Sequence, residues 1–343
     1  MIANPPQVGP VASWRALTPD DAPAVTELFN AARHAAGAPD ESRSVDEFRH
    51  ELDDPGVTLA IDSRGGWSAD GRLLAWGSVW CRVRPVTLSR AVLFGDVHPA
   101  VRRQGVGRAL LDWQLARAQE RLTRELPAGL PRRVDLFVSH GDAGRAALAR
   151  SAGLEPLRWF HKMTRAMDAP VVAQPVPAGL EMIAWTDAWV DAALEARNDA
   201  WREHWGYEPM PGDVWRHLFV EDPSFLRPAS RLAVADGRVV GFVMVTEQAT
   251  DDAGDGHTAW LDQIGVRRAW RRRGVAAALM GSALVALAEE GVRTVALDVD
   301  ADSPTGAMDL YERHGFRVIR TEALHGRALP GGDAAVAEDT AAG

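Results

Sequence analysis

Residues 263–276 carry the sequence QIGVRRAWRRRGVA, in which an apolar strand end, an arginine-rich loop and a helix start follow one another. We expect the strand to end at Val266 and the helix to open at Gly274, with its apolar side chains on one face. The first turn of a helix leaves about four backbone N–H groups unpaired and carries a partial positive charge. Gly274 and the small Ala276 allow a ligand to approach this backbone closely. The pattern therefore predicts a binding site for a pyrophosphate group.

Two common nucleotide-binding motifs are excluded. No Gly-Lys-Ser/Thr follows the glycines, as a Walker A loop requires. The related segment Gly105-Val-Gly107 lacks the third glycine of a dinucleotide fingerprint, and no ribose-binding acid follows it. An ordinary glycine-punctuated helix start is the alternative interpretation, but this loop occurs twice in the chain.

The loop belongs to an internal repeat, which indicates a duplicated domain. Residues 97–111 (VHPAVRRQGVGRALL) match residues 266–280 (VRRAWRRRGVAAALM) at an offset of 169. Two further matching blocks follow in the same order: VDLFV at 134–138 with VALDV at 295–299, and LARSAGL at 148–154 with LYERHGF at 310–316.

The chain has 343 residues, a length that fits two domains of ordinary size. The proline-rich stretch 168–179 predicts a linker between them. We therefore predict an N-terminal domain over 11–167 and a C-terminal domain over 180–329. The remaining ends, 1–10 and 330–343, have compositions typical of disorder.

Each half shows the same order of elements, with strands first and strand–helix–strand crossovers afterwards. This order predicts an α/β fold in which a mixed, mostly antiparallel sheet is flanked by helices. In the second half we expect helices over about 187–201, 212–219, 274–290 and 305–313, and strands over about 180–184, 231–235, 239–247, 258–266 and 293–299. In the first half we expect helices over about 18–36, 105–122 and 143–152, a short helix from 44, and strands over about 57–62, 73–83, 86–97, 133–138, 154–158 and 160–166.

The composition is that of a globular protein, with 46% hydrophobic and 25% charged residues. No apolar run reaches the ~18–20 residues of a membrane span, and the N-terminus lacks the features of a signal peptide. The single cysteine, Cys81, excludes a disulfide framework, so we expect a cytoplasmic protein. The histidines show no metal-binding spacing, and we expect no metal.

The net charge of −9 argues against nucleic acid as a partner. The charge is uneven: residues 1–170 carry a net +2 and residues 171–343 a net −11. The second half is thus suited to a cationic small molecule, although an acidic surface that only keeps the protein soluble is the alternative. Lys162 is the only lysine among 38 basic residues.

Both copies of the loop resemble the GNAT family of N-acetyltransferases. The family signature Arg/Gln-x-x-Gly-x-Gly/Ala is matched by 102–107 and by 271–276. A second family segment, Asn-x-x-x-Ala-x-x-Leu-Tyr-Glu-x-x-Gly-Phe, is similar to 303–316, where Ser303 replaces the asparagine. The resemblance covers about 11–328, and the two-domain layout is similar to that of mycothiol synthase, a tandem member of the family.

The resemblance implies two tandem GNAT folds, acetyl-CoA as co-substrate, and acetyl transfer to the primary amine of a small molecule by a monomer or homodimer. In the second half it implies acetyl-CoA contacts from Ile264, Val266, Arg271, Arg272, Arg273, Gly274, Val275, Ala276 and Ser303. In the first half the corresponding contacts are Val97, Arg102, Arg103, Gln104, Gly105, Val106 and Gly107.

The two halves differ at the positions where the family places catalytic groups. Tyr311 matches the family tyrosine that protonates the departing thiolate, whereas the first half has Ala149 there. Asp262 lies on the strand that often carries the base, on one face with Ile264 and Val266 if side chains alternate. At an offset of 169 its counterpart is Leu93. The resemblance therefore implies catalysis in the C-terminal domain, although a packing role for Tyr311 and an ion-pairing role for Asp262 are the alternatives.

The segment 201–217, WREHWGYEPMPGDVWRH, is rich in aromatic and charged residues. In GNAT proteins this loop walls the acceptor pocket, and aromatic rings with carboxylates suit a cationic amine. The candidate acceptor contacts are Glu203, His204, Trp205, Tyr207 and Trp215. The alternative is that these aromatics fill an interface between the repeats.

Two other functions fit the same sequence. The acceptor could be the N-terminus of a peptide or protein instead of a small amine. The chain could also be a regulatory module that senses CoA without turnover, which release of free thiol from acetyl-CoA would exclude.

Overall fold

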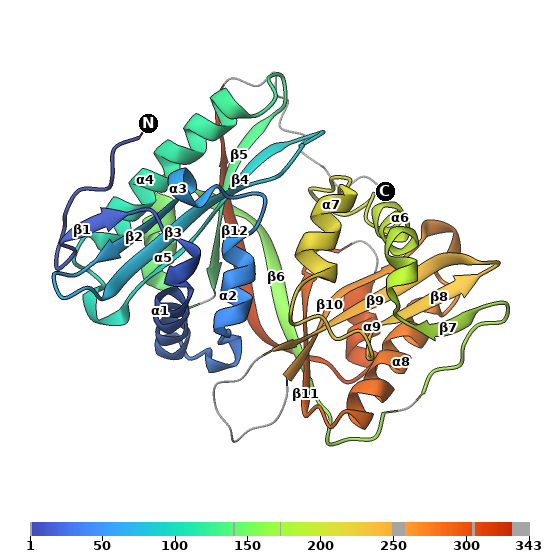
Figure 1. The fold of residues 1–343 in the computed structure, drawn as a ribbon. Helices are drawn as coiled ribbons and strands as arrows, with labels where there is room; N and C mark the ends of the chain where they lie inside the picture. Colours follow the sequence, from blue (N-terminus) through green and yellow to red (C-terminus); the bar gives the residue numbers. More distant parts are fainter. Residues whose placement is uncertain (1, 140, 172, 249–257, 304–305, 331–343) are drawn as a thin grey trace. The chain divides into compact units, whose positions relative to one another are not determined.

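The computed structural model describes residues 2–139, 141–171, 173–248, 258–303 and 306–330. The chain folds into two compact units: unit 1 contains Met1–Arg158 and Glu322–Gly343, and unit 2 contains Trp159–Thr321. Each unit is an α/β unit in which a mixed sheet is flanked by helices, which confirms the predicted fold class (Figure 1).

Unit 1 has a sheet in the order β1-β2-β3-β4-β5-β12. Strands β4 and β5 pair in parallel, and the other neighbouring strands pair antiparallel. The strands are β1 (Ser13–Arg15), β2 (Ser63–Trp67), β3 (Leu73–Cys81), β4 (Ser89–Val97), β5 (Arg132–Ser139) and β12 (Arg317–Ala328). The helices are α1 (Ala22–Ala35), α2 (Val45–Leu52), α3 (Leu59–Asp62), α4 (Val106–Glu120) and α5 (Ala143–Ser151).

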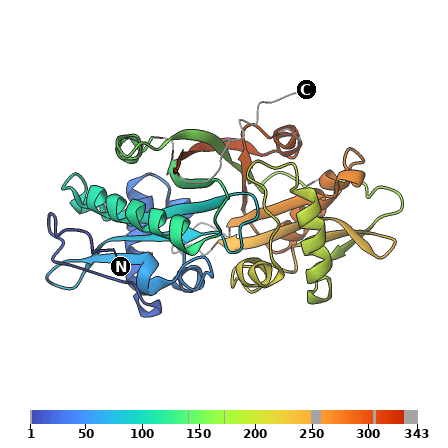
Figure 2. The ribbon, with the colours of Figure 1, turned by 90° about the horizontal axis from the view of Figure 1, so that it is seen from above.

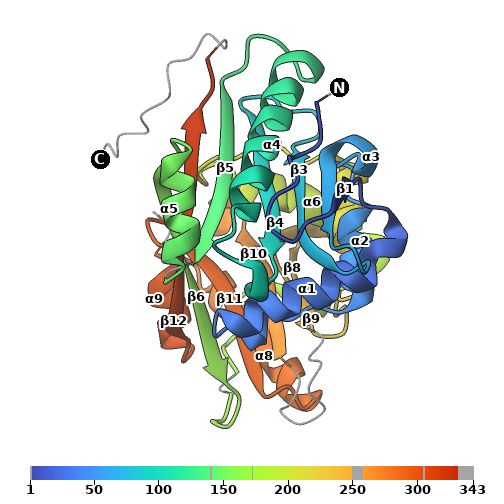
Figure 3. The same ribbon diagram turned by 90° about the vertical axis from the view of Figure 1, so that its left-hand side faces the viewer.

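Helices cover both faces of this sheet (Figure 3). On one face, Leu110 of α4 and Ala149 of α5 lie in one apolar core. On the other face, Leu28 of α1 and Phe48 of α2 lie in a second core. Seen from above in Figure 2, α4 is the teal helix that runs along the strands of this unit.

Unit 2 has a sheet in the order β6-β11-β10-β9-β8-β7, in which β10 and β11 are the parallel pair. The strands are β6 (Glu155–Ala166), β7 (Glu181–Ala184), β8 (Arg231–Ala235), β9 (Arg238–Gln248), β10 (Thr258–Val266) and β11 (Thr294–Asp300). The helices are α6 (Val190–Ala200), α7 (Gly212–Trp215), α8 (Val275–Glu289) and α9 (Ala307–Arg313).

The sheet of unit 2 also has a core on each face. Leu279 of α8 and Tyr311 of α9 lie in one core, and we call this side the α8 face. Ala193 of α6 and Trp215 of α7 lie in the other core, and we call this side the α6 face. The predicted helices and strands of this half are found within a few residues of the expected bounds.

The two units exchange their last strands. The chain enters unit 2 within β6, which pairs with β11, and returns to unit 1 within β12, which pairs with β5. The boundaries 11–167 and 180–329 are derived from the sequence repeat, and they stay a prediction of where the two duplicated copies begin and end. The folded units divide instead at 158/159 and 321/322. The predicted linker 168–179 contains no helix or strand among its described residues.

The N-terminal segment differs from the predicted disorder. The side chain of Asn4 donates to the carbonyl oxygen of Trp14 and accepts from Arg64 Nε at 2.7 Å. Ile2 and Val8 pack against the core beneath α4. Residues 2–10 are thus held against unit 1, because apolar side chains and an asparagine are distributed along a stretch that looks unstructured by composition. The predicted disordered tail lies, apart from Pro330, outside the described residues.

One predicted strand is wrong. Residues 59–62 form the short helix α3, and the strand begins only at Ser63. The Asp62 carboxylate accepts the backbone N–H of Thr58 at 2.7 Å and so closes a helical turn where the apolar pattern had indicated a strand.

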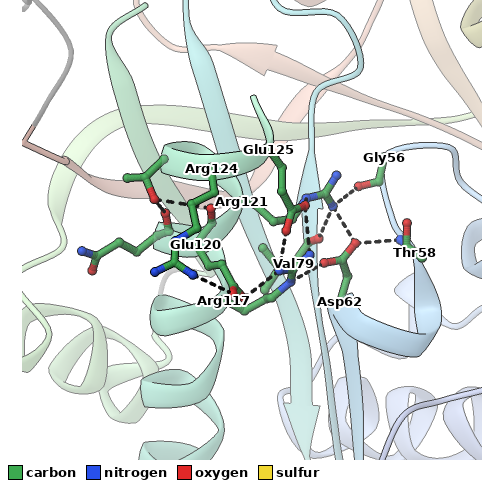
Figure 4. Close-up of polar contacts among 11 residues, drawn as sticks. Gly56, Thr58, Asp62, Val79, Arg117, Glu120, Arg121, Arg124 and Glu125 are labelled. Atoms are coloured by element: carbon green, nitrogen blue, oxygen red, sulfur yellow. Dashed lines mark hydrogen bonds and ion pairs between the residues drawn. The ribbon is translucent and has the colours of Figure 1, made fainter. Parts of the chain in front are cut away.

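Asp62 is also the centre of a buried ion network between α3 and the end of α4 (Figure 4). Its side chain has no exposed surface and accepts from Arg117 Nε and from an Arg121 nitrogen, each at 2.7 Å. Arg117 also bonds Glu120 and Glu125, the second of which lies in a π-helical turn that ends α4. The network gives both buried guanidinium groups a carboxylate partner.

Replacing Asp62 by Ala should lower the free energy of unfolding by about 3–5 kcal/mol, because two buried guanidinium groups lose a partner. Denaturant unfolding followed by circular dichroism measures the change. Asp112→Ala is the matched control: this carboxylate is 60% exposed and lies 3.7 Å from Arg108, so its loss should leave stability almost unchanged. Equal effects of the two substitutions would contradict the role of the network.

Candidate active site

Strands β10 and β11 pair over only part of their length. The recorded ladder joins Thr258–Trp260 to Thr294–Ala296, yet β10 continues to Val266 and β11 to Asp300. Among the described residues, the edge of β10 after Trp260 and the facing edge of β11 after Ala296 therefore have no strand paired with them. In unit 1, β4 and β5 likewise pair only at their starts.

The unpaired edge of β10 presents two backbone donors. The N–H of Arg267 donates to the carbonyl oxygen of Val240 at 2.8 Å, so odd-numbered residues here direct their N–H groups toward β9. The N–H groups of Ile264 and Val266 consequently point toward β11. These are the two strand residues that the sequence predicted for the ligand.

The arginine-rich loops of the two units have the same backbone conformation. In unit 2, Arg272 has φ +61° and Gly274 has φ +82°; in unit 1, Arg103 has φ +65° and Gly105 has φ +85°. A left-handed residue among right-handed ones turns successive N–H groups toward one point, which makes an anion-binding concavity. Each helix then begins directly after its glycine, at Val275 or Val106. The two units thus share a loop conformation that suits an anion, and its use for a pyrophosphate stays a prediction.

The loop arginines of unit 2 differ in their contacts. Arg271 donates to the carbonyl oxygen of Ala200 at 2.8 Å and pairs with Glu203, so it ties the loop to the end of α6. Arg268 pairs with Glu203 at 3.2 Å, and the Arg271 guanidinium holds the pKa of Glu203 below its usual range. Arg272 and Arg273 are exposed beside the helix start. Glu203, predicted as an acceptor contact, therefore pairs with the loop.

Strand β10 contains a β-bulge at Asp262. Leu261 pairs with Val245 and Ile264 pairs with Val243, and all four pack in the core of the α8 face. Val243 and Val245 are two residues apart on β9, but their partners Leu261 and Ile264 are three residues apart on β10. Asp262 is the extra residue, and it lies on the α6 face. The expectation that it shares a face with Ile264 and Val266 was wrong.

The bulge also changes the comparison with unit 1, where β3 and β4 pair without a register shift. Ala91 pairs with Val134 in unit 1, and Ala259 pairs with Val295 in unit 2. Counting along each strand from these equivalent pairs, Leu93 corresponds to Leu261. Asp262 therefore has no counterpart in unit 1, and bulges of this kind often re-aim a side chain at functional sites.

The Asp262 side chain is exposed to solvent on the α6 face, but protein atoms surround its carboxyl group closely enough to desolvate it. Desolvation by this surrounding protein raises its pKa to about 6, and the negative charge of Asp222 adds to the shift. A carboxylate with a pKa near neutrality is suited to accept a proton from an incoming group.

Tyr311 lies in α9 and is 6% exposed in the core of the α8 face, where its ring meets Phe316 edge-on. Burial raises the pKa of its phenol to about 12. The carbonyl oxygen of Tyr311 accepts the N–H of Phe316, as that of Ala149 accepts the N–H of Leu154. The structure thus places Ala149 at the equivalent position of unit 1. Ser303 lies in the loop between β11 and α9, half-buried.

The aromatic residues after α6 separate into core and surface groups. Trp215, predicted as an acceptor contact, has no exposed surface and lies in the core with Phe242, because α7 turns it inward. Trp201 stacks on Phe242 and on His204, with ring centroids 5.7 and 5.1 Å apart. Burial and the charge of Arg271 lower the pKa of His204, so its ring is neutral at pH 7. The predicted contacts Trp205 and Tyr207 are half-buried in the same loop.

Gly265 makes the position of Trp201 possible. A side chain at Gly265 would bring its Cβ within 2.4 Å of the Trp201 ring and 2.8 Å of the Phe242 ring. The indole therefore lies directly against the backbone of β10, one residue before Val266. Trp201 is not among the predicted acceptor contacts. A glycine in the strand opposite an aromatic-rich loop is the sequence signal that indicates it.

Unit 1 fills the same place with an ion pair. Asn30 and Asn198 each exchange two hydrogen bonds with a later backbone residue, Arg43 and Met210, and so mark equivalent positions. Three residues further on, unit 1 has Arg33 and unit 2 has Trp201. Arg33 pairs with Asp96 at 2.7 Å, and Asp96 occupies the position of Gly265.

Comparison with known proteins identifies the family. Residues 189–316 match the model of the Acetyltransferase (GNAT) family. A mycothiol acetyltransferase from Clavibacter michiganensis is 34% identical over 243 residues, which covers 68% of this chain and 71% of that protein. The chain belongs to the GNAT family of acetyltransferases. It is therefore an acyltransferase, and its family uses acetyl-CoA.

Solved GNAT structures share the architecture. A GCN5-related N-acetyltransferase from Sphaerobacter thermophilus superposes with a TM-score of 0.71 at 29% identity, covering 92% of this chain and 95% of that one. A tandem GNAT protein from the clavulanic acid biosynthesis pathway superposes with a TM-score of 0.69 at 19% identity, covering 92% and 98%. The second likeness supports the fold alone.

The described residues of this GNAT chain contain no cluster of three or more His, Cys, Asp or Glu side chains that could hold a metal ion. None of their helices is long and apolar enough to cross a membrane.

Proposed function

We propose that unit 2 transfers an acetyl group from acetyl-CoA to a primary amine of a small molecule, by direct attack of the amine on the thioester. The observation that carries the proposal is a difference between the units. Both have the anion-binding loop and the parting strands, but only unit 2 has a bulged carboxylate at Asp262 and a phenol at Tyr311.

Acetyl-CoA binding follows from the backbone of this unit. The N–H groups at the start of α8 receive the pyrophosphate, and Arg272 and Arg273 add positive charge beside it. The unpaired edges of β10 and β11 receive the amide groups of the pantetheine arm, in the manner of an added strand. The thioester carbonyl then lies near Val266, whose N–H stabilises the oxyanion that forms on attack.

Asp262 takes a proton from the attacking amine, directly or through one water molecule. The amine nitrogen bonds to the carbonyl carbon, the carbon–sulfur bond breaks, and the electron pair leaves with sulfur. The amide and the free CoA thiol are the products, and the proton held by Asp262 passes to solvent. No covalent enzyme intermediate is needed.

Tyr311 donates its O–H to the departing sulfur. A phenol with a pKa of about 12 stays protonated throughout the working pH range, so the donor is always present. Ordinary thiols have pKa values near 8.5, so full transfer to a relaxed thiolate is unfavourable. The phenol proton therefore passes to sulfur while the carbon–sulfur bond is still breaking, and the phenolate left on Tyr311 regains a proton from solvent, which has received the proton of Asp262.

The acceptor binds on the α6 face, between the Trp201–His204 stack and Asp262. The aromatic rings and the acidic charge of this half suit a small ammonium compound better than an extended peptide. Unit 1 keeps the loop that binds acetyl-CoA but not the chemistry, since Arg33 and Asp96 pair where Trp201 and Gly265 stand in unit 2.

The pH dependence of thiol release from acetyl-CoA, measured across a panel of primary amines, tests the function and the base together. At least one amine should support turnover, and kcat/KM should fall as the pH drops through about 6, because Asp262 becomes protonated. Asp262→Asn should remove this step and lower kcat by ~10²–10⁴-fold. The rise of kcat/KM at higher pH that is caused by deprotonation of the amine itself should persist in this variant. Absence of release with every amine would refute the proposed function.

The loop assignment predicts a change in acetyl-CoA affinity. Replacing Arg272 and Arg273 together by Glu should raise KM for acetyl-CoA at least tenfold, a cost above ~1.4 kcal/mol, because charge is reversed beside the pyrophosphate. The same change at Arg102 and Arg103 is the matched control and should leave this KM within about twofold. The opposite pattern would place the active centre in unit 1.

A further inference from the structure

The α6 face of unit 2 contains Lys162, whose strand β6 belongs by sequence to the first repeat. Lys162 lies on β6 directly opposite Asp298 of β11. Its Nζ is 4.5 Å from the ring centroid of Trp260 on β10, and the residue is 6% exposed. Between them Ala296 is 1% exposed, so the lysine stem crosses β11 above this small side chain.

The fold does not require charge at these positions. In unit 1 the equivalent cross-strand pair is Leu324 with Phe137, and the position of Trp260 is held by Val92. The same strand arrangement therefore forms with three apolar side chains. The lysine, the carboxylate and the indole are features of unit 2 alone.

The lysine lies on a face that carries several carboxylates, together with the Arg197 guanidinium over the Trp201 ring. Asp262, Asp298 and Asp300 all lie on this face, and Asp222 contributes to the pKa of Asp262. An ammonium group over an indole, with Asp298 at the paired position of the neighbouring strand, is an arrangement that suits a cation. Lys162 thus supplies from within the chain the charge that a second ammonium group of a ligand would otherwise supply.

We propose that Lys162 is a specificity-determining residue: it fills the Trp260–Asp298 cation position and restricts the acceptor to amines with a single ammonium group and a neutral body. The inference rests on the proposed acceptor site on the α6 face. Acceptors with a second ammonium group, such as polyamines, are excluded by charge repulsion and by occupancy of the indole.

Calorimetric titration of the full chain with spermidine, and with n-butylamine as the monoamine probe, tests this assignment. Lys162→Met should bind spermidine at least tenfold more tightly than the native chain, with n-butylamine affinity changed by less than about twofold. Adding Asp298→Asn to Lys162→Met should abolish the gain, because the released carboxylate is then lost. Lys162→Gln provides a second variant with a polar side chain of similar length and should show the same gain.

Arg293→Met is the matched control, since it removes one positive charge from the opposite end of β11 and should not increase spermidine affinity. No gain in the Lys162 variants, or a gain that persists without Asp298, would overturn the proposal. The titration needs no turnover, so its failure is distinguishable from failure of the proposed acetyl transfer. Unchanged thermal unfolding and acetyl-CoA binding show that the variants are folded.

Discussion

The parting of β10 from β11 is the constraint on which the rest of unit 2 depends. A strand edge inside a sheet leaves backbone donors and acceptors that must find partners. At this place the ladder ends at Trp260 and Ala296, while both strands continue. In the proposed function, an extended ligand with amide groups satisfies the edge, and the loop that follows β10 receives its phosphates. The bulge at Asp262 lies at the same point and turns a carboxylate toward the open face.

The two similar units of the duplicated chain differ at the positions on which the proposed function depends. Unit 1 preserves the loop, including the left-handed Arg103 and Gly105, but its strand β4 is regular. An ion pair between Arg33 and Asp96 stands where unit 2 has an indole over a glycine. The exchange of β6 and β12 places a strand of the first repeat in unit 2, and Lys162 lies on the α6 face of this strand.

Much of this could be predicted from the sequence, since helix starts, the repeat and the Tyr311 segment depend on local pattern. The bulge at Asp262 could not be predicted. The extra residue lies before a loop that matches its repeat at an offset of 169, and this match does not show that the offset changes earlier in the strand. The prediction that Trp215 contacts the acceptor is wrong, because composition does not distinguish a core indole from an exposed one. The exchanged strands, and with them Lys162 beside Trp260, depend on long-range pairing that no local pattern reports.

The most direct test of the central claim, that chemistry takes place in unit 2, is the steady-state kcat of Tyr311→Phe. The chain has two tyrosines, so Tyr207→Phe is a matched control that removes the other phenolic hydroxyl. We predict that Tyr311→Phe lowers kcat by ~10²–10⁴-fold while KM for acetyl-CoA changes little. Tyr207→Phe keeps the aromatic ring offered to the acceptor, so it should change at most KM for the amine and keep the native kcat. A native kcat in Tyr311→Phe would contradict the account and remove this unit's phenol from the reaction.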